Sequence, residues 1–217
     1  MPDLSEIVPQ TINVIGTAAG GSWRATYALS GASWADEPAP SPPALRVIAF
    51  SQRDPRWASV HLGGSAYTMG GAGCAVTASA SVATQVNPDM TPLQLVTWLN
   101  GNGGFTSGGL LYWSKVGEAV DGLRYVNYHL WRKEPADIVR LADALGRCAQ
   151  VVQVDFKPAT VALETHFVVA LSMTEGGADV NIIDPWTGGR GTLLGLYGTA
   201  GWDLKRAVYA MAEFALE

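Results

Sequence analysis

The sequence has few basic residues and no long apolar run. Only 14 of its 217 residues are lysine or arginine, no stretch concentrates them, and the formal net charge is -5. This distribution gives no electrostatic footprint for nucleic acid or for an anionic membrane surface, so we expect neither partner. No segment approaches the roughly 18 apolar residues of a membrane-spanning helix. The first residues also lack the basic start and apolar run of a signal peptide, so we expect synthesis in the cytoplasm and no membrane insertion.

Metal and cofactor motifs are missing as well. The chain contains no Cys-x-x-Cys pair, no His-Glu-x-x-His, no acidic calcium loop and no GxxxxGK[ST] phosphate loop. We therefore expect no metal ion and no cofactor. Two cysteines, Cys74 and Cys148, are too few for a disulfide scaffold, and we expect both to be free thiols. Of the three histidines, His61 and His129 stand alone in the sequence and are interpreted as structural.

The composition is that of a globular chain with one sizeable core, because 48% of the residues are hydrophobic and 15% are charged. Short β-type runs at 11–15 and 22–29 predict a small β appendage over residues 1–37. Residues 38–45 are rich in proline, which fixes φ and removes backbone donors, and predict an extended linker before a main domain at 46–217. The alternative is that the first strands pair with the main sheet and the prolines cross its surface.

Helical patterns dominate the first half of the main domain and β-type patterns the second, which predicts an α+β fold. A short strand is expected at 45–50. Helices are expected at 75–86, 92–99, 110–120 and 135–145, and further strands at 123–131, 148–156, 166–173, 180–184 and 206–214.

One cysteine stands where a nucleophile could be activated. Cys74 follows Gly70, Gly71 and Gly73, and it precedes a run without Gly or Pro that reads as helix. We expect the glycines to form a loop with turns closed to other residues. Free backbone N–H groups and the helix dipole at a helix start favour the thiolate, which is the nucleophilic form of cysteine. The alternative is a small buried core residue. Cys148 follows a helix end, where the dipole disfavours thiolate.

A histidine and an aspartate lie on two strands joined by a turn. The predicted strands His166–Met173 and Val180–Asp184 flank a glycine-containing turn, which is typical of a β-hairpin. Which side chains share a face depends on the length of the loop, because each one-residue slip moves a side chain to the other face of the sheet.

A three-residue loop at Glu175–Gly177 would pair Thr174 with Ala178. Asp184 would then share a face with His166, diagonally across the strands. A two-residue loop would turn Asp184 to the opposite face. A catalytic pairing of His166 with Asp184 therefore requires an odd loop or a β-bulge.

Together these residues fill the roles of a cysteine-nucleophile site. His166 would take the proton of Cys74, and Asp184 would hold the imidazole in the required tautomer. Gln52 offers an amide that could join the Cys74 N–H in an oxyanion hole. Each residue also has a structural alternative: His166 as a hydrogen-bonded core histidine, Asp184 as a turn former before Pro185, and Gln52 as a cap of the Asp54-Pro55 turn.

The order and the local sequences of these segments resemble those of the papain-like cysteine peptidases related to bacteriocin-processing double-glycine peptidases. The resemblance rests on 51–57 (SQRDPRW), 73–77 (GCAVT), 166–169 (HFVV) and the Asp184-Pro185 pair, and it covers about residues 48–184. In exporter-linked members the glutamine lies a few residues before the cysteine, whereas 21 residues separate Gln52 from Cys74 here.

This resemblance implies a papain-like fold, with the cysteine at a helix start packed on an antiparallel sheet that carries His and Asp. It implies that Cys74 is the nucleophile, His166 the general base, Asp184 its orienting group and Gln52 part of the oxyanion hole. Similar free-standing domains occur in bacterial cell-wall proteins and in phage lysis or tail proteins. The implied substrate is then a peptide or peptidoglycan cross-bridge, with release by lysis or attachment to a virion. The alternative function is a catalytically inactive binding module for a cell-wall or virion partner.

Overall fold

The computed structural model describes residues 11–18, 21–28, 46–131, 134–154, 166–198 and 201–217. The expected proline-rich linker, 38–45, lies outside the described residues. The chain divides into two units, Met1–Pro43 and Ala44–Glu217. In the first unit, β1 (Thr11–Ala18) and β2 (Gly21–Ala28) pair antiparallel in a two-stranded sheet of their own.

The second unit contains a six-stranded antiparallel sheet in the order β3-β8-β4-β5-β6-β7. Every residue of the central strand β4 is buried, as expected for a strand covered on both faces. The strands are β3 (Leu123–Leu130), β4 (Gln150–Val154), β5 (His166–Met173), β6 (Val180–Asp184), β7 (Gly189–Thr192) and β8 (Val208–Leu216). The predicted α+β class is confirmed.

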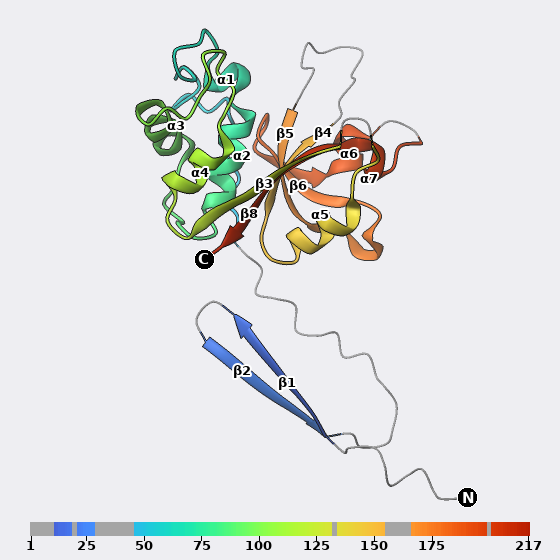
Figure 1. Ribbon diagram of the computed structural model, residues 1–217. Coiled ribbons are helices and arrows are strands. Elements are labelled where there is room, and N and C mark those ends of the chain that lie inside the picture. The colour runs from blue at the N-terminus through green and yellow to red at the C-terminus, as the bar shows by residue number, and fades with distance from the viewer. Residues whose placement is uncertain (1–10, 19–20, 29–45, 132–133, 155–165, 199–200) are drawn as a thin grey trace, which may run out of the picture. The chain divides into compact units, whose positions relative to one another are not determined.

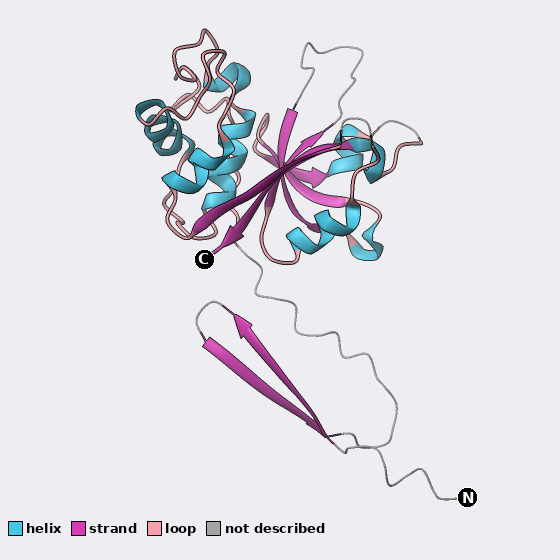
Figure 2. Ribbon diagram, in the orientation of Figure 1, coloured by secondary structure: helices cyan, strands magenta, loops and turns pink. Residues whose placement is uncertain are grey.

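Helices cover both faces of this sheet (Figures 1 and 2). One face packs against the N-terminal helices, as expected: α1 (Met69–Ala72), α2 (Cys74–Ala83), α3 (Pro92–Gly101) and α4 (Trp113–Ala119). The other face packs against a second layer that the sequence patterns did not reveal as such: α5 (Ile138–Leu145), α6 (Leu193–Tyr197) and α7 (Leu204–Ala207). Two separate apolar cores result, one on each side of the sheet.

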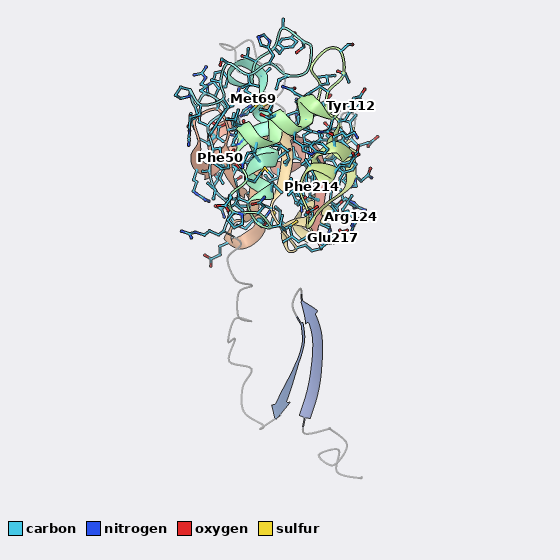
Figure 3. The ribbon with its side chains drawn as sticks, turned by 90° about the vertical axis from the view of Figure 1, so that its left-hand side faces the viewer. Phe50, Met69, Tyr112, Arg124, Phe214 and Glu217 are labelled. Carbon is cyan, nitrogen blue, oxygen red and sulfur yellow. The ribbon has the colours of Figure 1, made fainter. Side chains whose placement is uncertain are left out.

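Helix α2 is the central helix of the first layer. Nine of its ten residues are buried, and most are Ala, Ser or Val, whose small side chains let the helix lie close to β5. Figure 3 shows this helical side, with fully buried Met69 of α1 and Phe214 of β8 labelled among the packed side chains. No helix among the described residues is long and apolar enough to cross a membrane.

The glycines before Cys74 do not form the expected loop. Gly70 and Gly71 belong to the one-turn helix α1, and Gly73 joins α1 to α2 with an ordinary negative φ of -83°. Close packing explains Gly73 instead, because a Cβ there would lie 2.4 Å from the Met69 carbonyl oxygen. A Cβ on Gly70 would meet the Ala58 carbonyl oxygen at 3.0 Å. The expectation of turns closed to other residues was wrong, and the physical reason for glycine is lack of space.

Several element boundaries differ from the prediction. Residues 46–50 form no strand, because their backbone groups bond to side chains and not to a neighbouring strand. The Ile48 N–H donates to Thr84 Oγ1, and the Val47 carbonyl accepts from the Arg190 side chain. Helix α4 begins only at Trp113, and Leu110, predicted on its buried face, is 73% exposed. Helix α5 starts at Ile138, where the Asp137 side chain caps it. The one-turn helix α7 replaces the start of the last predicted strand, and neither β7 nor α6 was predicted.

The two neighbouring glycines provide a test of this packing explanation. Gly73→Ala should lower the free energy of unfolding by about 1–3 kcal/mol, because the added methyl group overlaps Met69. Gly71→Ala is the matched control, since its Cβ would meet only Thr68 Oγ1 at 3.6 Å. It should leave stability unchanged or raise it by up to about 1 kcal/mol. Urea denaturation of both variants measures this difference, and an equal loss of unfolding free energy in the two variants would contradict the explanation.

Candidate active site

A β-bulge in β5 sets the register of the β5–β6 hairpin. The turn holds four residues, 175–178, because the Thr174 N–H donates to the Asp179 carbonyl at 2.9 Å, so the loop is not the three-residue one considered above. Near the turn Ser172 faces Asn181, but past the bulge Ala170 faces Ile182. Leu171 is the extra residue, and it shifts the rest of β5 by one position against β6. The expected alternative, a bulge, is therefore what the hairpin contains.

This shift brings His166 and Asp184 together. The imidazole Nε2 and the carboxylate Oδ1 are 2.8 Å apart, and both side chains are buried, with 2% and 6% of the residue exposed. The two residues share the sheet face of Val168 and Ile182, which is the face covered by α5, α6 and α7. Without the bulge, Asp184 would point to the opposite face.

Cys74 approaches the same imidazole from the helical layer. It is the first residue of α2, it is 8% exposed, and its side chain is one of the groups whose proximity raises the pKa of His166. Because Asp184 engages Nε2, Nδ1 is the nitrogen left for the sulfur. The structure therefore brings together three of the four predicted site residues, Cys74, His166 and Asp184.

The environment favours a protonated imidazole. Burial by itself would lower the pKa of His166, but the hydrogen bonds and charges of Asp184 and Cys74 outweigh it and raise this pKa to about 9. For Asp184, burial opposes ionisation, and the hydrogen bonds from His166 and the Trp186 N–H reverse that effect, so the pKa of its carboxyl lies below the usual value. A carboxylate beside an imidazolium is the resulting charge state at neutral pH.

Sequence reasoning missed a further residue of this site. Tyr197, the last residue of α6, hydrogen-bonds to Asp184, and its ring centroid lies 5.5 Å from that of His166. Burial and the neighbouring Asp184 carboxylate raise the pKa of Tyr197, so it remains a phenol that can donate. The Trp186 N–H donates to Asp184 Oδ1 at 2.9 Å. A five-residue helix carries no sequence signal for such a contact.

Gln52 bridges the two sides of the site. Its backbone N–H donates to the Pro185 carbonyl at 2.7 Å, directly after Asp184. Its side-chain Nε2 donates to the Gly70 carbonyl at 3.2 Å, one helical turn before Cys74. The residue is 1% exposed, and its Oε1 has no hydrogen-bond partner among the described residues. Gln52 is thus tied to the helix that precedes Cys74, although 21 residues separate it from Cys74 in the sequence.

The other cysteine and histidines lie elsewhere. Cys148 is fully buried, its thiol donates to the Phe214 carbonyl at 3.2 Å, and burial raises its pKa. His129 contacts Glu213 at 2.7 Å, in an ion-pair cluster with Arg140 and Arg147. His61 is exposed, and its ring nitrogen Nδ1 lies 3.1 Å from the Ser65 carbonyl oxygen. Across the described ranges, no three His, Cys, Asp or Glu side chains gather as a metal site would require.

A cavity of about 650 Å³ opens beside Cys74. Trp113 at the start of α4 stacks on Tyr128 of β3 and meets Phe167 of β5 edge to face, and all three side chains line the cavity. Leu110, which the sequence pattern placed on a buried helix face, lines it too.

Comparisons with protein families, with curated proteins and with solved structures each found no match.

The raised pKa of His166 predicts a measurable titration. The imidazole signals of His166 in NMR spectra should titrate with a midpoint near pH 9, so the ring carries its proton below that pH and loses it above. Cys74→Ala should lower the midpoint, because one of the two groups that stabilise the imidazolium is removed and burial remains. Cys148→Ala, which changes a thiol outside the site, should leave it unchanged. A wild-type midpoint below 7 would contradict this charge state.

Proposed function

We propose that this chain is a cysteine-dependent hydrolase of peptide or amide bonds, a cysteine peptidase or amidase with a papain-like arrangement. The observation that carries the proposal is the set of contacts at one point of the fold. A cysteine at a helix start meets a buried imidazole, and the opposite nitrogen of that ring is held by a carboxylate at 2.8 Å. Among the described residues, His129 also contacts a carboxylate, that of Glu213, but no cysteine contact is found for it, and Cys148 bonds to Phe214 and Gln150 rather than to a histidine.

The first half-reaction forms a covalent intermediate. The thiolate of Cys74 attacks the carbonyl carbon of the scissile bond, and a carbon–sulfur bond forms. His166 then gives its proton to the leaving nitrogen from Nδ1, the carbon–nitrogen bond breaks, and the amine departs. The acyl group remains on the sulfur as a thioester. A pKa of about 9 for His166 means that this proton is present at neutral pH.

The second half-reaction releases the acyl group. His166, now neutral, takes a proton from water while the water oxygen attacks the thioester carbon. The carbon–sulfur bond breaks, the product carboxylic acid leaves, and Cys74 returns to the thiolate beside the imidazolium. Asp184 orients the ring throughout and stabilises its charged form, and Tyr197 and the Trp186 N–H hold the carboxylate in place.

Both half-reactions place negative charge on the former carbonyl oxygen. Cys74 is the first residue of α2, so this helix contains no carbonyl four residues earlier that could accept its backbone N–H. Gln52 is the second donor in this proposal, because one hydrogen of its amide goes to Gly70 and the amide carries two. The substrate suggested by the resemblance is a peptide of peptidoglycan, in a bacterial cell-wall or phage context such as that of an endolysin.

Alkylation of the thiols tests the proposal without a substrate. Iodoacetamide at pH 7 should label Cys74 at least about tenfold faster than Cys148, because Cys74 lies at a helix start beside the His166 imidazolium, a setting in which cysteines react fast, whereas Cys148 is fully buried and burial raises the pKa of its thiol. Peptide mapping by mass spectrometry gives both rates in one sample. His166→Ala should slow the labelling of Cys74 and leave that of Cys148 unchanged. Equally slow labelling of both cysteines would favour the inactive binding module instead.

A further inference from the structure

The cavity beside Cys74 has a defined chemical character. Of the described residues that line it, none is Asp, Glu, Lys, Arg or His. Its walls are aromatic and aliphatic side chains from the loops around Leu62 and Leu110 and from the aromatic group of Trp113, Tyr128 and Phe167. Away from Cys74, a charged group entering this space would lose its hydration and find no opposite charge among these residues, which costs several kcal/mol.

One polar pair lies within these apolar walls. The Tyr128 hydroxyl donates to Gln153 Oε1 at 2.7 Å, and both residues line the cavity. Burial raises the pKa of Tyr128 to about 12, so the phenol keeps its proton and this bond keeps its direction. The bond also fixes the orientation of the Gln153 amide, with Oε1 occupied. Among the described residues nothing accepts a hydrogen bond from Gln153 Nε2, which leaves an amide donor in the cavity wall.

The size of the cavity indicates how much of a ligand it holds. Small-molecule sites span about 300–1,000 Å³, and 650 Å³ lies in the middle of that range. A glycine or alanine beside the scissile bond would leave most of the space empty, whereas a large side chain with its flanking backbone would occupy it. A backbone carbonyl of that segment would be the natural acceptor for the Gln153 amide.

We propose that this cavity selects a substrate with a large, uncharged, apolar side chain next to the bond attacked by Cys74. Gln153 is the polar residue that orients the adjoining backbone. The inference rests on the proposed function, which places the reacting bond at Cys74. Among peptide substrates, it disfavours those with a glycine or an ionised residue next to the reacting bond.

Binding to the Cys74→Ala variant tests the inference independently of catalysis. The probes are acetylated and amidated oligoglycine pentapeptides whose central residue is Phe, Leu, Gly, Glu or Lys, measured by isothermal titration calorimetry. The Phe and Leu peptides should bind at least about tenfold more tightly than the Gly peptide, because burying such a side chain is favourable. The Glu and Lys peptides should bind no more tightly than the Gly peptide. Equal affinities, tighter binding of the Gly or charged peptides, or no binding at all would overturn the inference.

Two glycine variants locate the binding in the cavity. In the Cys74→Ala background, Gly108→Phe should weaken binding of the Phe peptide at least about tenfold, since Gly108 lines the cavity and its Cβ would meet only Thr106 Oγ1, at 3.8 Å. Gly101→Phe is the matched control, because Gly101 is exposed, has no atom near its Cβ position and does not line the cavity. It should leave the affinity unchanged. Equal effects of both substitutions would overturn the assignment to this cavity.

A third variant tests the polar contact. Gln153→Met keeps the length of the side chain and removes the amide, and it should weaken binding of the Phe peptide by about 3- to 10-fold. Unchanged affinity would remove Gln153 from the proposal.

The proposed function can fail separately from the ligand preference. Tight binding of the Phe peptide to Cys74→Ala, with no cleavage of this peptide by the wild type, would refute hydrolysis and leave the ligand preference standing. Preferential cleavage of the Gly peptide by the wild type would support hydrolysis and refute the ligand preference.

Discussion

The hydrogen bond between His166 and Asp184 depends on one inserted residue, Leu171. The turn of the β5–β6 hairpin has an even number of residues, which by itself would place the imidazole and the carboxylate on opposite faces of the sheet. The bulge at Leu171, between His166 and the turn, reverses that outcome. Every other part of the site then follows from this register: the position of the imidazole, the contact with Cys74 and the support of Asp184 by Tyr197.

The site lies where the helical layer meets an end of the sheet, and the segment around Gln52 ties the two together. One backbone bond joins Gln52 to the residue after Asp184, and one side-chain bond joins it to the turn before Cys74. The next residue, Arg53, lies 3.4 Å over the ring of Trp186. These contacts tie the segment before Cys74 to the His166–Asp184 pair, and the proposed reaction would need these three groups at fixed positions.

Sequence reasoning predicted the parts of the fold with strong local signals. The Thr91-Pro92 start of α3, the hairpin of β5 and β6 and the position of Cys74 in the first turn of α2 were predicted correctly. It failed where tertiary contacts replace local patterns. The backbone of residues 46–50 bonds to side chains, and residue 73 is a glycine because Met69 leaves no room for a Cβ. Tyr197 could not be found from the sequence, because its contact with Asp184 depends on how α6 packs. Leu110 fits a helical stripe but lines the cavity.

The central claim is that Cys74 carries the acyl group of a substrate during turnover. The most direct test mixes the protein with an activated acyl ester, stops the reaction rapidly with acid and analyses the peptides of the protein by mass spectrometry. The account predicts a mass increase equal to the acyl group on the peptide that contains Cys74. This adduct should be removed by hydroxylamine, as a thioester is, and should be absent in His166→Ala. An adduct on Cys148 or on another side chain, or turnover that persists in Cys74→Ala, would contradict the account.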